Sequence, residues 1–428
     1  METTRMVIVG GGAAGFFGAI ACAEALRARG QPCESNQVIL LEATAHLLAK
    51  VKVSGGGRCN TTHACFDPRE LVKRYPRGGR ELLGPFYRWG PRETVAWFSQ
   101  RGVTLKTEED GRMFPDTDNS QTIIDCLQRA ASEAGVTIRP RCGVSKVEHI
   151  KGSPELPIGP ATSDTGKFRL TLTTNETVVC DRLLLATGGN RSNAGYTIAE
   201  AAGHTIEPPV PSLFTFHIND PRIKDLPGVS VENAETAVRV AKLRESGPLL
   251  ITHWGMSGPA ILKLSAWGAR LLHDLNYQFT LGINWAPSHT VDTAAKLLSD
   301  ARRNNPKKQV TTWCPFGFSQ RLWERLVAAA GIVPGTVWTA TSNDALRALA
   351  TQVCAGEFAV SGKSLFKEEF VTCGGVKLSE VDFKTMQSRL CPGLYFAGEM
   401  LDIDGVTGGF NFQAAWTTGH IAGEAMAE

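Results

Sequence analysis

The sequence lacks the features that mark membrane, secreted and metal-cluster proteins. None of its apolar runs approaches the ~18 residues that a membrane-spanning helix needs. Residues 1–4 lead almost directly into an apolar segment, which leaves no room for a signal peptide. The eleven cysteines include no C-x-x-C pair, and the nine histidines show no metal-ligand spacing. We therefore expect a cytoplasmic protein with reduced cysteines, no membrane association and no metal.

A strong charge of one sign is also missing. The 45 lysines and arginines against 42 aspartates and glutamates give a net charge of +3, which neither demands nor excludes nucleic acid as a partner. Two segments, 67–93 and 296–325, are nevertheless basic. Aromatic residues interleave with these charges at Tyr75, Phe86, Tyr87, Trp89, Trp313 and Trp323. Such segments could hold RNA by phosphate contacts and stacking, although a solvated helix face is the more common explanation.

Glycine, in contrast, is abundant. The 44 glycines among 428 residues are about 10% of the chain, against a usual ~7%, while the 22 prolines are ordinary in number. An excess of glycine without an excess of proline indicates many places where the backbone takes positive φ or approaches a ligand closely.

The first forty residues follow a strand–turn–helix–strand pattern. Residues 6–9 are a short apolar run, Gly10-Gly11-Gly12-Ala13-Ala14-Gly15 follows it, and 16–29 has the composition of a helix. A second apolar run at 38–41 ends at Glu42. This G-x-G-x-x-G turn lets a pyrophosphate approach the backbone at a helix amino terminus, and the acid can accept hydrogen bonds from a ribose diol. The pattern predicts a dinucleotide-binding fold.

Remote segments favour FAD over NAD as that dinucleotide. The chain has no second G-x-G-x-x-G, and Cys59 and Cys65 have neither spacing of a redox disulfide. An apolar strand at 182–185 runs into Ala186-Thr187-Gly188-Gly189. Near the carboxyl end, a strand with Glu399 at its tip precedes the glycine loop 405–413 and a helix. A glycine loop at a helix amino terminus suits the anionic edge of a reduced flavin, and Glu399 would then bind the ribityl hydroxyls.

Taken together, these segments resemble the bacterial FAD-binding flavoproteins of the aminoacetone oxidase-like or BaiN-like (bile-acid ene-reductase) family. The resemblance spans nearly the whole chain and rests on 10–15, 52–60 (Lys-Val-Ser-Gly-Gly-Gly-Arg-Cys-Asn), Phe114-Pro115, 186–189, 252–259 (Thr-His-Trp-Gly-Met-Ser-Gly-Pro), 372–376 and 392–423. The chain departs from the family after Gly189, where most members continue with Ser-aromatic-Pro and this chain has residues 190–196 (Asn-Arg-Ser-Asn-Ala-Gly-Tyr). This departure leaves the substrate open.

The resemblance implies an α/β fold: a Rossmann-like FAD-binding domain with an inserted domain. Residues 1–204 and 373–428 would form the FAD-binding domain. Alternating short runs at 213–218, 229–231, 236–240 and 277–283 predict a β-barrel-like insertion over 205–372, with a helical subdomain at about 290–356. We expect the following residues to bind the cofactor: Gly10, Gly12, Ala13, Ala14, Gly15, Glu42, Lys52, Ser54, Gly56, Gly57, Arg58, Ala186, Thr187, Gly188, Gly398, Glu399, Gly408, Gly409, Asn411, Phe412 and Gln413.

Three side chains are candidates for the chemistry. Arg58 would favour an anionic reduced flavin or an anionic substrate, and Cys59 could donate a proton when hydride adds to a double bond. The alternative for Cys59 is a buried thiol with no chemical role. His253 lies in a tight turn that could face the flavin, although an ordinary core turn is the more common explanation.

The leading hypothesis is an FAD-dependent oxidoreductase that transfers hydride between flavin N5 and a small organic substrate. The preferred reaction is reduction of an activated C=C bond with NAD(P)H as a transient donor. The resemblance includes members that reduce uridine to dihydrouridine in ribosomal RNA, so ribosomal RNA is an alternative substrate. A non-catalytic FAD-binding sensor or assembly protein is a further alternative, and the oligomeric state stays open.

Overall fold

The computed structural model describes residues 5–30, 36–150, 167–189, 193–364 and 371–428. The chain forms two compact units: unit 1 comprises Met1–Val210 and Lys367–Glu428, and unit 2 comprises Pro211–Phe366. Both ends of the sequence therefore contribute to unit 1. Within the described ranges, no helix combines the length and the apolar character needed to cross a membrane. Nor do three or more metal-ligating side chains gather there into a group that could hold an ion.

Unit 1 is built on a seven-stranded sheet. Its strands, in spatial order, are β19 (Val381–Asp382), β20 (Gln387–Ser388), β21 (Leu394–Phe396), β10 (Arg182–Leu185), β1 (Met6–Val9), β2 (Val38–Leu41) and β6 (Thr137–Arg139). The strands from β21 to β6 are parallel, and β19 and β20 pair antiparallel at one edge. Every residue of β1 and β2 is buried, as is typical of parallel strands covered on both faces. The strands predicted at 6–9 and 38–41 are confirmed.

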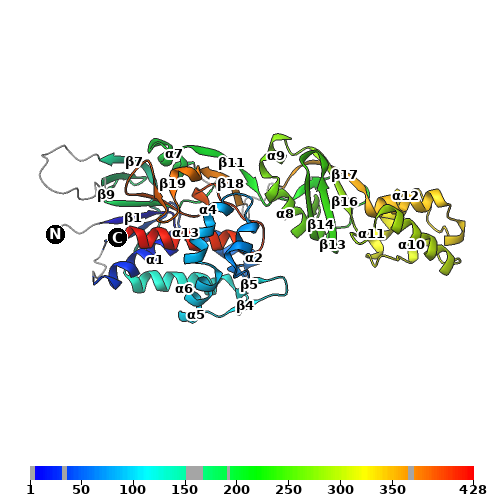
Figure 1. Cartoon of the computed structure of the whole chain (residues 1–428), viewed down its shortest axis with the longest axis horizontal. Helices are drawn as coiled ribbons and strands as arrows, with labels where there is room; N and C mark the ends of the chain where they lie inside the picture. Colours follow the sequence, from blue (N-terminus) through cyan, green and yellow to red (C-terminus); the bar gives the residue numbers. More distant parts are fainter. Residues whose placement is uncertain (1–4, 31–35, 151–166, 190–192, 365–370) are drawn as a thin grey trace, which may run out of the picture. The chain divides into compact units, whose positions relative to one another are not determined.

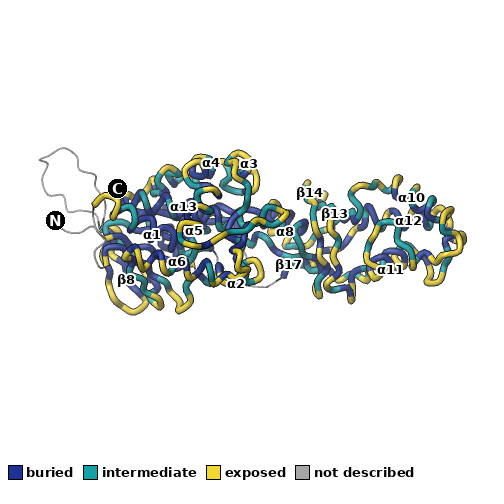
Figure 2. The backbone as a smooth tube through the Cα atoms, turned by 90° about the horizontal axis from the view of Figure 1, so that it is seen from below, coloured by how far each residue is buried: buried dark blue, intermediate teal, exposed yellow. Residues whose placement is uncertain are grey.

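Two helices from opposite ends of the sequence pack together in unit 1. These are α1 (Ala13–Ala28) and α13 (Phe410–Met426), which lie side by side and are mostly buried (Figures 1 and 2). A Cβ at Gly419 would press on the Ala14 carbonyl, and one at Gly423 would overlap the Gly18 carbonyl. Small residues on both helices thus permit close backbone contact, and the apolar composition all round each helix matches its burial.

Smaller elements complete unit 1. Its further helices are α2 (Ala49–Gly57), α3 (Pro68–Leu71), α4 (Gly79–Arg88), α5 (Pro91–Gln100), α6 (Ser120–Ala134) and α7 (Ala194–Ala201). Its minor sheets pair β3 (Thr62–His63), β5 (Arg112–Pro115) and β4 (Leu105–Thr107), then β7 (Val144–Ile150), β8 (Lys167–Leu172) and β9 (Thr177–Cys180), then β11 (Ile206–Ser212) and β18 (Val371–Val376).

Unit 2 is a closed six-stranded antiparallel barrel with helices attached. Around the barrel the order is β12 (Phe216–Ile218), β15 (Gly255–Ser257), β14 (Leu243–Ile251), β13 (Ser230–Val238), β16 (Phe279–Asn284) and β17 (Gly356–Lys363). The helices are α8 (Pro259–Trp267), α9 (Ala269–Asp274), α10 (Val291–Asn304), α11 (Gln320–Ala329) and α12 (Asn343–Cys354). The expected fold class, a Rossmann-like domain with an inserted barrel and a helical part, is confirmed.

The strand pattern of the barrel corrects one expectation. The separate strands predicted at 229–231 and 236–240 are a single strand, β13. Its pairing with β14 shifts register between Val231 and Ala234, so the intervening polar residues break the alternation without ending the strand. The sequence pattern also misses β14, because Gly247 and Pro248 lie inside it and are rare in strands.

Candidate functional site

The first turn has the geometry of a phosphate-binding loop. A Cβ at Gly10 would overlap the Ala186 carbonyl, and a Cβ at Gly15 would overlap the Gly10 carbonyl, so both positions require close backbone packing. Gly12 differs, because a Cβ there would meet nothing within 4 Å. Gly12 is also the amino-terminal cap of α1, which continues through Ala13 and Ala14. The free space therefore lies where the helix amino terminus favours a phosphate.

Glu42 lies at the end of β2, beside this turn. One carboxylate oxygen accepts a hydrogen bond from the Gly11 N–H at 2.8 Å, and the other accepts from the Thr44 N–H at 2.8 Å. The two backbone donors fix the orientation of the carboxylate. Each oxygen retains a lone pair that could accept a ribose hydroxyl.

The second glycine segment ends helix α2 with a kink. Ser54 leaves helical geometry, and Gly55, Gly56 and Gly57 all take positive φ, between 58° and 84°. Three successive residues in this region would strain any side chain larger than glycine. A Cβ at Gly56 or Gly57 would meet nothing within 4 Å, so this backbone also lies open to a ligand.

Cys59 follows the glycine run and is fully buried. Burial raises the pKa of its thiol from 9.0 to about 11, although hydrogen bonds with Thr61 and Ser54 lower it in part. Its backbone φ is +62°, a left-handed conformation separated from that of the glycines by the right-handed Arg58. The thiol is therefore protonated at neutral pH. This state suits a proton donor and does not suit a thiolate nucleophile.

Arg58 is engaged by acids of its own unit. Its guanidinium lies 2.6 Å from Glu108 and 3.4 Å from Asp118, and it stacks over the Phe114 ring at 4.0 Å. These partners partly neutralise the positive charge of Arg58, which was expected to face an anionic flavin or substrate. The Phe114 of the sequence motif thus supports Arg58 directly.

A lysine that the sequence analysis missed joins the site. Lys50 Nζ lies 2.5 Å from a carboxylate oxygen of Glu399. The same oxygen accepts a weak hydrogen bond from the Gly189 N–H at 3.4 Å, so Glu399 contacts both helix α2 and the turn after β10. The predicted residue, Lys52, is exposed, and its carbonyl accepts a hydrogen bond from Ser120. The K-x-K pattern in the sequence could have raised both lysines as candidates.

The carboxyl-terminal loop is held by its own polar side chains. Asn411 accepts from the Gly405 N–H at 2.8 Å and donates to the Gly405 carbonyl at 2.9 Å. Gln413 is fully buried, accepts from Thr62 at 2.6 Å and donates to Thr94 at 3.0 Å. The side chains of these two predicted residues therefore shape the loop. Gly409 is the amino-terminal cap of α13, and its N–H donates to the Asn60 side chain at 2.9 Å, so a ligand would have to be met by the N–H groups of the first helical turn.

A buried ion pair stabilises the same loop at its start. The Arg77 Nε lies 2.5 Å from Asp404, and a second nitrogen of the guanidinium contacts the other oxygen of that carboxylate. The Asp404 side chain is 0% exposed and that of Arg77 is 13% exposed. The sequence analysis did not find Arg77, because 327 residues separate the partners.

Other predicted residues are also brought to the centre of unit 1. Ala186 follows β10, and its N–H donates to Val9 at 2.8 Å. The Thr187 hydroxyl donates to the Met400 sulfur at 2.9 Å, and a Cβ at Gly188 would meet nothing within 4 Å. Gly398 faces Ala14, and Phe412 stacks on Trp416 at 5.6 Å. Residues 190–192, within the departure from the family pattern, lie outside the described residues.

His253 belongs to unit 2, whereas the predicted cofactor residues belong to unit 1. It is exposed in the turn between β14 and β15, next to Trp254 at a ring separation of 5.9 Å. Its assignment as a catalytic residue stays a prediction.

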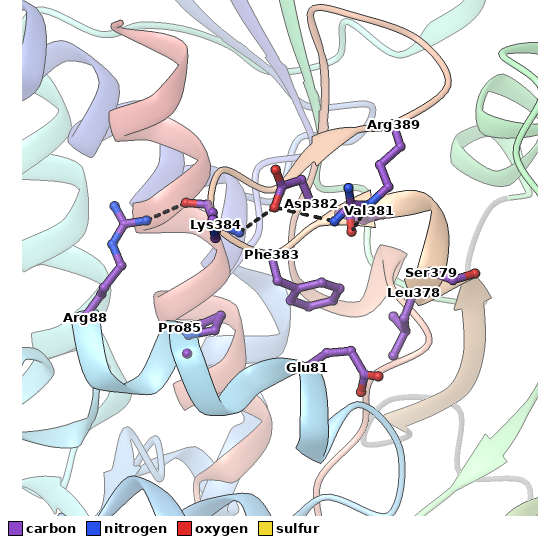
Figure 3. A pocket seen from close by; sticks show the side chains of 11 residues that line it. Glu81, Pro85, Arg88, Leu378, Ser379, Val381, Asp382, Phe383, Lys384 and Arg389 are labelled. Atoms are coloured by element: carbon purple, nitrogen blue, oxygen red, sulfur yellow. Dashed lines mark hydrogen bonds and ion pairs between the residues drawn. The ribbon is translucent and has the colours of Figure 1, made fainter.

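Unit 1 also holds a hollow that is separate from these residues. A cavity of about 410 Å³ lies between α4 and the β19–β20 hairpin, with Pro85, Leu378 and Phe383 in its walls (Figure 3). Arg88 donates to the Lys384 carbonyl at one end. None of the predicted cofactor residues lines it, so the cavity is distinct from the glycine-rich site.

The described residues of the glycine-rich site fit a long dinucleotide. Open backbone at Gly12, Gly56, Gly57 and Gly188 gives it room, and Glu42 supplies a ribose acceptor. The amino termini of α1 and α13 supply N–H groups for phosphate and for a negatively charged ring edge. We refer to this set as the flavin cradle.

Sequence relatives cover the whole chain. The family model "HI0933-like protein Rossmann domain" matches residues 4–425. The ribosomal RNA dihydrouridine synthase of Escherichia coli (strain K12) is 30% identical over an alignment of 427 residues, which covers 98% of this chain and 96% of that protein. The 3-dehydro-bile acid delta(4,6)-reductase of Clostridium scindens is 28% identical over an alignment of 441 positions, which covers 99% of each chain.

A solved structure shares the fold. The 3-ketosteroid-delta4-(5alpha)-dehydrogenase from Rhodococcus jostii RHA1 superposes with a TM-score of 0.50 at 16% identity, over 99% of this chain and 97% of that one. At this identity the similarity concerns the fold alone.

Proposed function

We propose that this chain, which belongs to the HI0933-like family and is an FAD-dependent oxidoreductase, reduces an activated carbon–carbon double bond. The double bond takes up a hydride at one carbon and a proton at the other. NAD(P)H is the proposed source of the hydride and leaves as NAD(P)⁺. When bound, FAD supplies the two-electron chemistry that links the donor to the double bond.

One observation carries this proposal: the names of two relatives aligned over nearly their full length describe the same type of reaction on different substrates. A dihydrouridine synthase saturates a double bond of uracil, and a delta(4,6)-reductase saturates double bonds of a bile acid. In both cases the bond is conjugated with a carbonyl group, which makes it a hydride acceptor. We infer that the reaction class is common to the family while the substrate varies.

The chain's own residues position the reactants in this proposal. Gly12 and the amino terminus of α1 hold the pyrophosphate, and Glu42 holds the adenosine ribose. Glu399, oriented by Lys50, accepts from the ribityl chain. The start of α13 places its backbone N–H groups against the anionic edge of the ring.

Cys59 is the proposed proton donor. Its thiol lies two residues after the open Gly57 and stays protonated, because burial raises its pKa to about 11. Because the thiol is fully buried, this role requires that it become accessible when a substrate binds.

Anaerobic mixing tests the donor. The purified holoprotein, mixed separately with NADH and NADPH, should lose its visible flavin absorption with one of them. Adding an α,β-unsaturated carbonyl compound should then restore the absorption and yield the saturated product. Flavin that stays oxidised with both nicotinamides would exclude them as donors. Flavin that stays oxidised with every donor would favour the non-catalytic alternative.

A second candidate, reduction of uridine in ribosomal RNA, is favoured by the two synthases at 30% identity and by exposed basic residues. Lys296, Lys307 and Lys308 are exposed in the helical part of unit 2. Half of the six expected stacking residues are unavailable, since Tyr75, Phe86 and Trp323 are buried, whereas Trp89 and Trp313 are partly exposed. Phosphate contacts would therefore have to supply the affinity, with Tyr87, which is exposed, as a remaining platform.

Nucleoside analysis of ribosomal RNA tests this candidate. Deletion of the gene should abolish one ribosomal dihydrouridine, and the purified enzyme with NAD(P)H should restore it in RNA from the deletion strain. Unchanged dihydrouridine content in that strain would remove the candidate and leave the double-bond reductase with a small substrate.

A further inference from the structure

We propose that a polar pocket in unit 2 binds a nucleotide, whose phosphoryl group is held by Lys224 and Arg321. The pocket has a volume of about 510 Å³, within the usual range for small-molecule sites. Its walls come from the loop 218–227, the turn Thr252–Gly255 and helix α11. The inference rests on the proposed function in one respect: the reactants expected for that function, NAD(P)H or RNA, are nucleotides.

The walls of the pocket are fixed by backbone hydrogen bonds. The Ile218 N–H donates to the Trp254 carbonyl at 2.9 Å, and the Thr252 N–H donates to the Gly255 carbonyl at 2.8 Å. A Cβ at Gly255 would overlap the Phe216 carbonyl, so the turn must carry glycine there. This requirement explains the glycine of the Thr-His-Trp-Gly motif. The turn is thereby held tightly, and it presents Thr252 and His253 to the pocket.

The pocket is lined by two acids and two bases, but one of the acids is already paired. Asp220 lines it but is neutralised by Arg222, which donates to both of its oxygens at 2.8 and 2.7 Å. The pKa of Asp220 is lowered, because these hydrogen bonds outweigh the burial that would raise it. Lys224 and Arg321 remain as cations, against Asp225 as the other acid in the lining. The pocket therefore suits an anionic group.

Arg321 reaches the pocket from α11. One of its guanidinium nitrogens donates to the Asp225 backbone carbonyl, which anchors the side chain to the loop. The remaining N–H groups of the fork can bind a phosphoryl oxygen, a geometry in which arginine binds phosphate strongly.

The hydroxyl of Thr252 provides an independent sign of a ligand. Its Oγ1 is buried and has no hydrogen-bond partner among the described residues. A buried hydroxyl without a partner is unfavourable, so a ligand that completes its hydrogen bond is favoured.

The mixture of groups indicates a nucleotide in preference to a simple anion. Lys224, Arg321 and the Thr252 hydroxyl can donate to phosphoryl oxygens, whereas the Asp225 carboxylate can only accept. A nucleotide satisfies both kinds of group, because its phosphate accepts while its ribose hydroxyls and base N–H groups donate. The phosphoryl group could come from an RNA backbone or from a nicotinamide dinucleotide.

Binding of two non-reacting probes to the FAD-loaded enzyme tests the proposal and separates these sources. The probes are a uridine hexaribonucleotide and NADP⁺, titrated at one fixed salt concentration by calorimetry. The variants are Arg321→Gln, Lys224→Gln and Thr252→Val. Arg239→Gln is the matched control, because this arginine lies in unit 2 with a 78% exposed side chain in a surface ion pair with Glu357. Thermal unfolding and the flavin spectrum check that each variant is folded.

We expect Arg321→Gln and Lys224→Gln to lower the affinity for one of the two probes about tenfold. Thr252→Val should lower that affinity less, and Arg239→Gln should leave it unchanged. A loss of affinity for the hexanucleotide alone assigns the phosphoryl group to RNA. A loss of affinity for NADP⁺ alone assigns it to the dinucleotide. If Arg321→Gln unfolds, the exposed Lys224→Gln decides. Equal affinities in wild type and folded variants, equal losses in Arg239→Gln, or no binding of either probe would overturn the inference. Because neither probe reacts, its failure is distinct from loss of reductase activity.

Discussion

Lys50 and Glu399 form an ion pair of 2.5 Å that joins helix α2 to the strand tip after β21, across 349 residues of sequence. The two residues come from the two ends of the chain that make unit 1. Their ion pair therefore connects the amino-terminal and carboxyl-terminal parts of the flavin cradle.

Removing Lys50 should weaken the hold on FAD. We expect Lys50→Met to release flavin roughly threefold to tenfold more readily in dialysis, because Glu399 loses the partner that orients it. Lys52→Met is the comparison, since Lys52 is exposed and was the residue expected from the sequence. Greater flavin loss from Lys52→Met than from Lys50→Met would restore the original assignment.

Gly12 should separate cofactor binding from folding. Its φ of −90° is open to any residue, and a Cβ there meets only free space, so Gly12→Val should leave the unfolding free energy of the apoprotein within ~0.5 kcal/mol. The new side chain would occupy the pyrophosphate position, and we expect the FAD content after purification to fall at least about tenfold. Gly10→Ala is the contrasting variant. Its Cβ would overlap the Ala186 carbonyl, so it should lose ~1–3 kcal/mol of stability.

The buried thiol of Cys59 makes stability depend on pH at the alkaline end. Its pKa is raised from 9.0 to about 11 by burial, so the folded state favours the protonated form. This contribution is fully present below pH 9.0 and is lost as pH rises towards about 11, by ~2–3 kcal/mol in total. Urea unfolding at pH 8 and pH 10.5 should therefore show a smaller drop for Cys59→Ala than for wild type. An equal drop in both proteins would place the alkaline instability elsewhere.

The same residue should matter in only one half of the reaction. If Cys59 donates the proton, Cys59→Ala should slow product formation ~10²-fold or more while the nicotinamide reduces the flavin at the normal rate. Rapid mixing of each half-reaction measures this difference. Equal slowing of both halves would indicate a structural role for the thiol.

Breaking the Arg77–Asp404 pair should be costly. Asp404 is 0% exposed, so Arg77→Met leaves a buried carboxylate without its main cation, and we expect a loss of ~3–5 kcal/mol in unfolding free energy. The double variant Arg77→Met/Asp404→Leu removes both charges and should recover much of the loss. A double variant no more stable than Arg77→Met would show that the loop depends on the pair for its shape.

The local features of the fold could be read from the sequence. Strand β1, the glycine turn and strand β2 follow each other within forty residues, and each has a composition typical of its role. The glycines of the cradle could be proposed for the same reason, because they lie in short runs. Glu42 could be proposed because an acid at the end of the second strand typically binds a ribose in this fold.

Long-range pairing could not be predicted from these patterns. Lys50 and Lys52 are equivalent in the sequence, and only the direction of α2 shows which one meets Glu399. Arg77 gave no signal, since its partner lies 327 residues away. Strand β14 was hidden by Gly247 and Pro248, whose cost in an isolated strand is offset when the barrel closes around them.

The interlocking of α1 with α13 has a consequence for how the protein is made. The backbone of α1 at Ala14 and Gly18 is contacted by Gly419 and Gly423, which are synthesised long after it. While the chain is still emerging from the ribosome, α1 and its phosphate turn have no carboxyl-terminal partner to pack against. Unit 2 can fold in this interval, but the nascent chain cannot close around FAD. Cofactor capture therefore follows synthesis of residues 410–426, and ribosome-bound chains halted before that point should carry no flavin.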